Sequence, residues 1–341
     1  MQIRLDQSLQ EHNTLALPAR ARALVEASSS EEIIEALDWA QAEGLAVVPW
    51  GEGSNVVLAG DLDALVLKQG SRGLQVLAET DRDVRLRVGA GNNWHTLVEH
   101  CLAAGYHGLE NLALIPGAVG AAPVQNIGAY GTELDRFVEC VHAIDIATGE
   151  ALHLQRDDCR FAYRDSIFKA ELKGRVIITA LDLRLAKTAM VEYSYPTLAE
   201  RLEAMAVSEP GPQEIFDAVV AVRRERLPDP NEEPNAGSFF KNLILPYEQA
   251  AYARRSFVDM PCHNMADGRV KIPAAWLIER RGWKGKRRGN VGVHPGHALV
   301  LVHYGGASGT ELLDLAEEVR EDVRQLIHRR LEIEPRVLGG T

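Results

Sequence analysis

The chain has 341 residues, of which 46% are hydrophobic and 25% charged, and its formal net charge is −11. At ~100–200 residues per domain this length predicts two or three domains, and the composition excludes disordered, collagen-like and small disulfide-rich proteins. The four cysteines form no C-x-x-C pair, which argues against a structural zinc site and favours reduced thiols in a cytoplasmic protein. No stretch approaches the ~20 apolar residues of a membrane span, and residues 1–13 lack an apolar signal core. An acidic chain is also an unusual general nucleic-acid binder.

The first 67 residues predict a β-α-β unit followed by another strand. A strand over 23–27 precedes a helix that begins near Ser30, carries acidic residues in its first turn and ends at Gly44. Further strands are expected over 46–49 and 62–67. The polar, irregular stretch 69–83 indicates a domain boundary.

The middle of the chain predicts a strand over 84–88, a helix over 94–104, a glycine-rich turned segment over 112–131, and a hairpin over 140–146 and 151–154. A strand is expected over 175–185 and a second boundary over 208–212. The last third predicts helices over 213–226, 247–257, 273–281 and 310–328, and strands over 298–303 and 331–337.

Two glycine-rich motifs follow predicted strands. Gly-Glu-Gly-Ser-Asn at 51–55 can direct backbone N–H groups at an anionic oxygen, although an ordinary tight turn is the alternative. Gly-Ala-Gly-Asn-Asn-Trp at 89–94 resembles a dinucleotide fingerprint, but Trp94 stands where that motif needs a small residue. We interpret the second motif as a strand–helix corner.

Three further segments could carry chemistry. Small residues over 114–131 allow close approach to a flat ligand, or form a crowded loop. Arg164 lies among apolar residues, where it can pair with Asp165 or Asp157, or bind a substrate carboxylate. Ser238, before two aromatic residues, can be a turn serine or a functional one.

The charged motifs are less specific. Alternation along the last predicted strand places Glu332 and Glu334 on one face, so at least one needs a partner or a shifted pKa. The basic run 280–288 can bind phosphate or nucleic acid, but a solvated loop is usual. His294 and His297 lack the surroundings of a zinc peptidase motif, so we predict no metal site.

Taken together, these motifs resemble one family, the UDP-N-acetylenolpyruvoylglucosamine reductases, also called UDP-N-acetylmuramate dehydrogenases. The resemblance rests on Gly-Glu-Gly-Ser-Asn at 51–55, the segment 115–131, Tyr-Arg-Asp-Ser-Ile-Phe at 163–168, Leu-Pro-Asp-Pro at 227–230 and Asn-Ala-Gly-Ser-Phe-Phe-Lys-Asn at 235–242. The motifs occur in family order. Tyr195 is similar to the substrate-loop tyrosine of the family's longer subtype.

The resemblance implies an α+β fold with three domains, two of which form a vanillyl-alcohol-oxidase-type FAD-binding fold. The implied bounds are 1–70 with the C-terminal strand 331–341, 71–208, and 209–330 for the UDP-sugar domain. It implies non-covalent FAD, NADPH as co-substrate, and reduction of UDP-N-acetylglucosamine enolpyruvate in peptidoglycan precursor synthesis. We expect a cytoplasmic monomer without nucleic-acid or membrane partners.

The resemblance also assigns roles to residues. Arg164 and Glu334 would stabilise charge on the substrate carboxylate, with Glu334 protonated, and Ser238 would protonate the intermediate after hydride transfer to the methylene carbon. The substrate would be bound by Tyr195, Arg226, Lys241, Asn242 and Lys284, and Lys241 could also make Ser238 more acidic. The cofactor-binding residues would be Gly51, Glu52, Gly53, Ser54, Asn55, Pro116, Gly117, Gln125, Asn126, Gly128, Ala129 and Tyr130.

Several positions depart from the family pattern. Arg226 replaces a lysine, and Arg336 follows Pro335 where a second acid is usual, so Glu332 is an alternative to Glu334. His263 and His297 stand where a tyrosine and a glutamine are expected. Two other functions fit part of the sequence: an FAD oxidase of small alcohols or sugars, and a nucleotide- or nucleic-acid-binding protein that uses 280–288.

Overall fold

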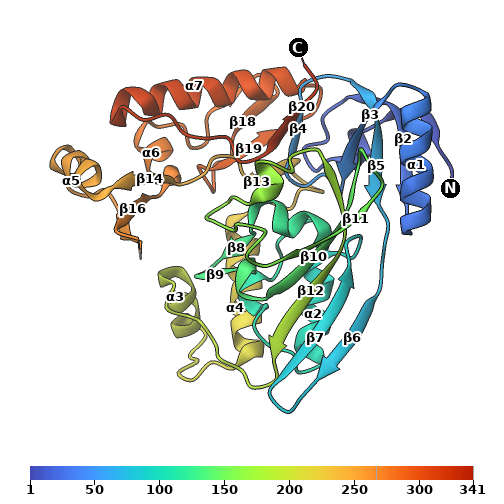
Figure 1. Cartoon of the computed structure of the whole chain (residues 1–341). Coiled ribbons are helices and arrows are strands. Elements are labelled where there is room, and N and C mark those ends of the chain that lie inside the picture. The colour runs from blue at the N-terminus through green and yellow to red at the C-terminus, as the bar shows by residue number, and fades with distance from the viewer. Residues whose placement is uncertain (266, 341) are drawn as a thin grey trace. The chain divides into compact units, whose positions relative to one another are not determined.

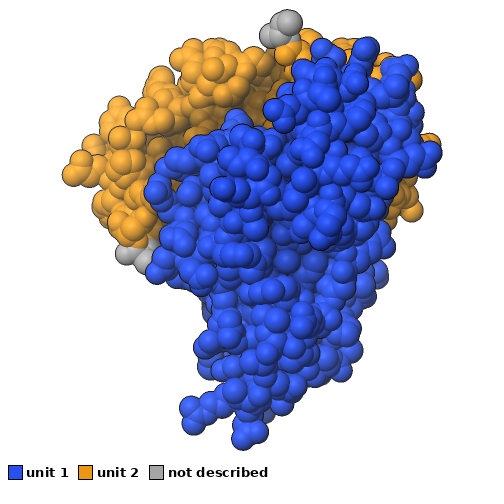
Figure 2. All heavy atoms as spheres, turned by 45° about the vertical axis from the view of Figure 1, so that its right-hand side comes forward, with its two compact units in different colours: residues 1–7, 21–53, 62–225 blue, residues 8–20, 54–61, 226–341 orange. Residues whose placement is uncertain are grey.

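The computed structural model describes residues 1–265 and 267–340, and the chain divides by packing into two compact units, which Figure 2 colours separately. The first unit comprises Met1–Gln7, Ala21–Gly53 and Leu62–Glu225. The second comprises Ser8–Arg20, Ser54–Asp61 and Arg226–Thr341. These units reflect packing, and the three-domain bounds stay a prediction.

The first unit contains the predicted β-α-β arrangement. Its sheet has the order β1-β2-β5-β3, in which β2 and β3 both run parallel to β5. Figure 1 shows α1 beside these strands, and its Ile33, Ala36, Leu37 and Ala40 form a core with Leu65 and Leu67. The elements are β1 (Arg4–Ser8), β2 (Arg20–Ala27), α1 (Ser30–Ala42), β3 (Ala46–Trp50) and β5 (Leu62–Gln69).

The first unit also contains a five-stranded antiparallel sheet of order β11-β10-β12-β7-β6. Its strand β6 lies inside 69–83, so the prediction of an irregular segment there was wrong. Most β6 side chains are exposed, which removes the apolar alternation that identifies a half-buried strand. The strands are β6 (Leu74–Glu79), β7 (Asp83–Gly89), β10 (Val138–Asp145), β11 (Ala151–Gln155) and β12 (Val176–Ala186).

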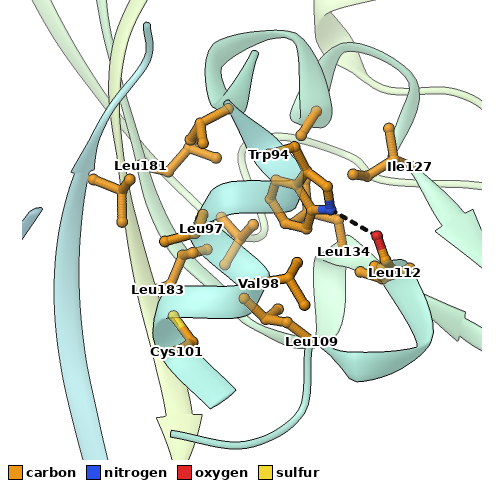
Figure 3. Packing of buried hydrophobic residues seen from close by; sticks show 14 of the residues in the cluster. Trp94, Leu97, Val98, Cys101, Leu109, Leu112, Ile127, Leu134, Leu181 and Leu183 are labelled. Atoms are coloured by element: carbon orange, nitrogen blue, oxygen red, sulfur yellow. Dashed lines mark hydrogen bonds between the residues drawn. The ribbon is translucent and has the colours of Figure 1, made fainter. Parts of the chain in front are cut away.

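Three helices contribute to the core on one face of this sheet: α2 (Trp94–Ala103), α3 (Pro196–Ala204) and α4 (Pro212–Arg226). Figure 3 shows Trp94 inside this core, where its indole Nε1 donates a hydrogen bond to the carbonyl of Leu112 at 2.9 Å. Sequence analysis missed α3, because it is short and buries only Leu198 and Leu202. The segment 110–136 consists of 3-10 turns and a small hairpin: η2 (Glu110–Leu112), η3 (Val119–Gln125), β8 (Gly128–Ala129), β9 (Thr132–Glu133) and η4 (Leu134–Arg136).

The second unit is a smaller α+β assembly. Its four-stranded sheet has the order β13-β19-β18-β17, and a three-stranded sheet has the order β14-β16-β15. Figure 1 shows α7 along β18 and β19. The elements are β13 (Asn235–Ser238), β14 (Leu243–Pro246), α5 (Tyr247–Ser256), β15 (His263–Asn264), β16 (Arg269–Ile272), α6 (Ala274–Arg280), β17 (Arg287–Arg288), β18 (Val291–Val293), β19 (Val300–His303) and α7 (Gly309–Ile327).

The last strand is shorter than the sequence predicts. Only β20 (Arg336–Leu338) forms, and it pairs in parallel with β4 (Val56–Leu58). Pro335, which has no N–H to donate, separates β20 from an isolated bridge between Ile333 and Phe240. The predicted α+β class is confirmed. Among the described residues, no helix is both long and apolar enough to cross a membrane.

Candidate active site

The first unit has a strained backbone in its glycine-rich segment. Leu114, Asn126, Tyr130 and Arg164 have φ values of 56°, 44°, 47° and 53°, a region that non-glycine residues rarely adopt. Residues held in such conformations cost ~1–3 kcal/mol each and cluster at functional sites. The strain therefore marks 114–130 and the turn around Arg164 as a candidate ligand-binding surface.

Both the backbone N–H and the backbone carbonyl of Leu114 are hydrogen-bonded to side chains. Its N–H donates to Nδ1 of His95 at 3.0 Å, and its carbonyl accepts from Nε of Arg223 at 3.1 Å. Burial lowers the pKa of Arg223, Tyr130 opposes this, and the Arg164 guanidinium lowers the pKa further. Two guanidinium groups near one another, one of them desolvated, favour a bound anion. Sequence analysis missed Arg223, although its place beside the apolar face of α4 could have drawn attention to it.

Asn126 is 1% exposed and its amide group is bonded within the chain. Its Oδ1 accepts from the N–H of Asp135 at 2.9 Å, and its Nδ2 donates to Glu133 at 3.2 Å and to the carbonyl of Ala162 at 3.3 Å. These bonds stabilise the left-handed conformation, which asparagine tolerates better than most residues.

Arg164 is positioned by the small hairpin β8–β9. Its Nη2 donates to the carbonyl of Gly128 at 2.5 Å. A Cβ on Gly128 would lie 3.1 Å from Nη1 of Arg164 and 2.8 Å from Cγ of Glu133, so only glycine fits there without displacement. Next to this position, Tyr130 and Tyr195 pack edge to face, with ring centroids 5.6 Å apart.

The turn after β3 is held by Asn93, the N-cap residue of α2. Glu52 accepts from Nδ2 of Asn93 at 3.0 Å, and Asn93 also caps α2 through the N–H of Thr96. Gly53 has a φ of 68°, and a Cβ on Gly51 would lie 3.4 Å from Cβ of Ala118. Gly51, Glu52 and Gly53 thus form a tight turn against the start of η3.

The motif at 89–94 is a strand–helix corner, as interpreted from the sequence. It connects β7 to α2, and the N–H of Trp94 donates to the carbonyl of Gly117 at 2.9 Å. The N–H of Gly120 donates to the carbonyl of Ala90 at 2.8 Å, and a Cβ on Gly120 would lie 2.6 Å from that of Ala90. Small residues over 117–122 therefore pack closely against this corner, and Pro116 before them is exposed. Backbone that carries few bulky side chains suits close approach of a large flat cofactor such as FAD.

In the second unit, Ser238 and Glu334 lie on neighbouring extended segments. Ser238 ends β13, and the N–H of Glu334 donates to the carbonyl of Phe239 at 2.9 Å. Phe239 and Phe240 are buried beneath this pair. After Pro335, the N–H of Arg336 donates to the carbonyl of Asn55 at 3.0 Å, so Ser54 and Asn55 belong to the same neighbourhood.

Glu332, the alternative to Glu334, has a cation as its partner. Nζ of Lys241 lies 2.9 Å from its Oε2, and the Glu332 side chain is 72% exposed. Solvent and an ammonium group therefore satisfy this carboxylate. Glu334 is the acid next to the serine-bearing strand.

Two predicted substrate-binding residues, Arg226 and Lys284, lie close enough to His297 in the second unit to influence its pKa. Burial lowers the pKa of His297 to about 4, and Arg226, His294 and Lys284 contribute in the same direction. Lys284 also pairs with Glu279 at 3.2 Å. Separately, Oδ1 of Asn242 accepts from the N–H of Ala274 at 3.0 Å, and His263 is exposed on β15.

The basic run 280–288 forms ion pairs with the protein itself. Arg280 pairs with Asp259 at 3.1 Å, and Arg281 and Arg288 pair with Asp322 and Glu318. Neutralised guanidinium groups are weak phosphate ligands. The structure therefore gives no support to nucleic-acid binding through this run.

Comparisons with known proteins find two family matches in this chain. An FAD binding domain family matches residues 21–155, and the family "UDP-N-acetylenolpyruvoylglucosamine reductase, C-terminal domain" matches residues 229–338. UDP-N-acetylenolpyruvoylglucosamine reductase of Paraburkholderia phymatum is 46% identical over 332 residues, which cover 97% of this chain and 96% of that protein. The enzyme of the same name from Pseudomonas fluorescens is 42% identical, with 98% of both chains covered.

A solved structure supports the fold. The crystal structure of UDP-N-acetylenolpyruvylglucosamine reductase from Thermus caldophilus aligns with a TM-score of 0.66 and 23% identity, over 99% of this chain and 98% of that one. Sequence identity above 40% over nearly the full length, together with both domain matches, establishes the relationship. This chain belongs to the UDP-N-acetylenolpyruvoylglucosamine reductase family.

Proposed function

We propose that this chain uses FAD and NADPH to reduce UDP-N-acetylglucosamine enolpyruvate to UDP-N-acetylmuramate, a step of peptidoglycan precursor synthesis. The observation that carries the proposal is family membership over nearly the full chain, with an FAD binding domain matched at residues 21–155. The serine and the glutamate expected for this reaction also lie on adjacent segments of one unit.

Bound FAD would accept hydride from NADPH and supply it to the enolpyruvyl methylene carbon. The backbone of residues 51–55 would hold the pyrophosphate, because closely spaced turns present N–H groups to anionic oxygens. Pro116, Gly117, Gln125, Gly128, Ala129 and Tyr130 would line the remainder. We assign Asn126 a positioning role, since its amide group stabilises the strained turn.

Arg164 and Glu334 would act on the substrate carboxylate. Hydride addition to the methylene carbon develops enolate-like charge on that carboxylate, and a cation together with a hydrogen-bond donor stabilises it. Arg164 is fixed for this by Gly128, and Arg223 adds positive charge near it. Glu334 would donate from its protonated form.

Ser238 would give the proton that completes the reaction at the carbon next to the carboxylate. A serine hydroxyl is a weak acid, so its surroundings must favour the alkoxide. Lys241, three residues later, would contribute its ammonium charge, and its ion pair with Glu332 restricts where that charge lies.

The nucleotide sugar would be bound by Tyr195, Arg226, Asn242 and Lys284. Arg226 and Lys284 both influence His297, so their charges share one neighbourhood suited to a diphosphate. We further propose that residues 1–70 with 331–341 and residues 71–208 bind FAD, and that 209–330 bind the UDP-sugar. A cytoplasmic monomer without membrane or nucleic-acid partners completes the proposal.

Steady-state turnover tests this function. NADPH oxidation by the FAD-loaded enzyme should require UDP-N-acetylglucosamine enolpyruvate, and mass spectrometry should find a product that has gained one hydride and one proton. NADPH oxidation that proceeds equally well with oxygen alone, without this product, would reassign the chain to the small-molecule oxidases.

A further inference from the structure

A group of metal-ligating side chains lies on the five-stranded sheet, away from the proposed active-site residues. Cys140, His142 and Asp182 each place one ligand atom within 4.8 Å of the others, and His153 adjoins them. We call Cys140, His142, His153 and Asp182 the sheet-face cluster. It lines an open pocket of about 730 Å³.

The register of the sheet explains why these residues meet. Cys140 and His142 lie two residues apart on β10 and therefore share a face, opposite Val141, which is buried in the core. On β12, Asp182 pairs directly with Cys140, and on β11, His153 pairs directly with His142. The sequence predicted no metal site. The residues of the sheet-face cluster come from three strands and do not match a sequence motif such as C-x-x-C.

The orientation of His142 is that of a metal ligand. Its Nδ1 lies 2.8 Å from Nδ1 of His153, a hydrogen bond that fixes the ring. Its Nε2 lies 2.9 Å from Oδ2 of Asp182, yet this buried atom makes no hydrogen bond of acceptable geometry among the described residues. Because Nδ1 can carry the ring proton in its contact with His153, Nε2 can offer its lone pair to a metal ion that replaces its present contact with Asp182.

The side chain of Arg87 holds the Asp182 carboxylate in place. Nε and Nη2 of Arg87 donate to Oδ1 and Oδ2 of Asp182 at 2.7 and 2.8 Å. Each carboxylate oxygen accepts two partners, so Arg87 orients Asp182 and leaves a lone pair on Oδ2.

The other cations of the pocket have carboxylate partners, which argues against an anion as its ligand. Arg85 pairs with Glu139 at 2.5 Å, and Arg156 pairs with Asp135 at 3.0 Å. The donor atoms that remain are a thiol sulfur, an imidazole nitrogen and a carboxylate oxygen. A thiolate with imidazole selects zinc-class metals over magnesium or calcium.

We propose that Cys140, His142 and Asp182 bind one zinc ion, with water in the fourth position. His153 would orient His142, and Arg87 would orient Asp182. Zinc bonds of ~2.0–2.3 Å place tetrahedral donors about 3.3–3.8 Å apart, so side-chain shifts of about 1 Å close the site. Binding releases the thiol proton of Cys140, and the metal–thiolate bond replaces the S–H bond without any redox change.

Equilibrium dialysis of the FAD-loaded enzyme tests the proposal. After treatment with a chelator, the protein is dialysed against micromolar zinc chloride and its metal content is measured by atomic emission. We expect one zinc per chain, loss of that zinc in Cys140→Ser and His142→Gln, and ~10–100-fold weaker binding in His153→Phe. Cys262→Ser, which changes a cysteine of the second unit, is the matched control and should bind zinc normally.

A second measurement needs no variant. Zinc should slow alkylation of Cys140 in the unmodified chain, as mapped by peptide mass spectrometry, and cobalt should give tetrahedral d–d absorption at wavelengths beyond the flavin bands. Absence of zinc binding by the unmodified enzyme, or binding that Cys140→Ser and His142→Gln leave unchanged, would overturn the site. Neither result depends on reductase activity.

Discussion

In the first unit several proposed site residues have a positive φ, whereas in the second unit the proposed catalytic pair lies on extended, hydrogen-bonded segments. Leu114, Asn126, Tyr130 and Arg164 all have left-handed backbone conformations. Ser238, by contrast, ends β13, whose pairing with β19 is irregular between Asn235 and Ser238, and lies beside the segment that carries Glu334. The proposed residues thus depend on backbone conformation in the first unit and on pairing between extended segments in the second.

This difference indicates that the two groups of residues have different roles. Strained turns persist only when neighbours hold them, and His95, Arg223 and Glu133 do so through hydrogen bonds. Such turns shape a surface for a large, rigid cofactor. The segments that carry Ser238 and Glu334 are held by backbone hydrogen bonds to their neighbours. Substitutions that disturb the strained turns should therefore affect stability and FAD affinity, and substitutions of Ser238 and Glu334 should affect chemistry.

The largest expected effect is that of Ser238→Ala. Loss of a general acid typically costs ~10²–10⁴ in rate, so flavin reoxidation by the enolpyruvyl substrate should slow by that factor. Flavin reduction by NADPH should remain nearly unchanged, as measured by stopped-flow absorbance. Ser256→Ala, at an exposed position of the same unit, is the control. Equal loss in both half-reactions would assign Ser238 to structure.

Substitution of Glu334 should slow the second half-reaction far more than substitution of Glu332. Glu334→Ala should slow the second half-reaction by ~10²–10³, because it removes a donor aimed at developing charge. Glu332→Ala should change either rate less than ~5-fold, since an exposed ion pair contributes ~1 kcal/mol or less. A reversal of the two results would make Glu332 the catalytic acid.

Asn126→Ala tests the strained turn. It leaves the N–H of Asp135 without its acceptor and places alanine at positive φ, so the free energy of unfolding should fall by about 3 kcal/mol. FAD affinity should fall with it, as followed by urea denaturation and flavin fluorescence. Asn264→Ala, on an exposed strand, should leave both quantities unchanged. A stable Asn126→Ala variant with normal FAD binding would refute the positioning role.

The smallest effect concerns the pH dependence of stability. Since the pKa of His297 is lowered to about 4, the unfolded chain takes up this proton first, and stability falls as the pH drops from about 6.5 towards 4. At pH 5 the loss relative to pH 7.5 should be about 2 kcal/mol. His297→Gln should lack this component in urea denaturation, whereas the exposed His263→Gln should keep it.

Sequence analysis predicted the motifs and most elements, because periodicity and capping residues are local signals. It missed β6, whose side chains are mostly exposed, and α3, which is short. It could not foresee the clamp of His95 and Arg223 on Leu114, or the sheet-face cluster. Both depend on long-range contacts between strands or helices that no local pattern encodes.

The most direct measurement is the anaerobic visible spectrum of the purified protein. The account predicts flavin bands that bleach with NADPH and return when UDP-N-acetylglucosamine enolpyruvate is added in the absence of oxygen. A colourless protein that takes up no FAD, or bands that return only with oxygen, would contradict the proposed reaction.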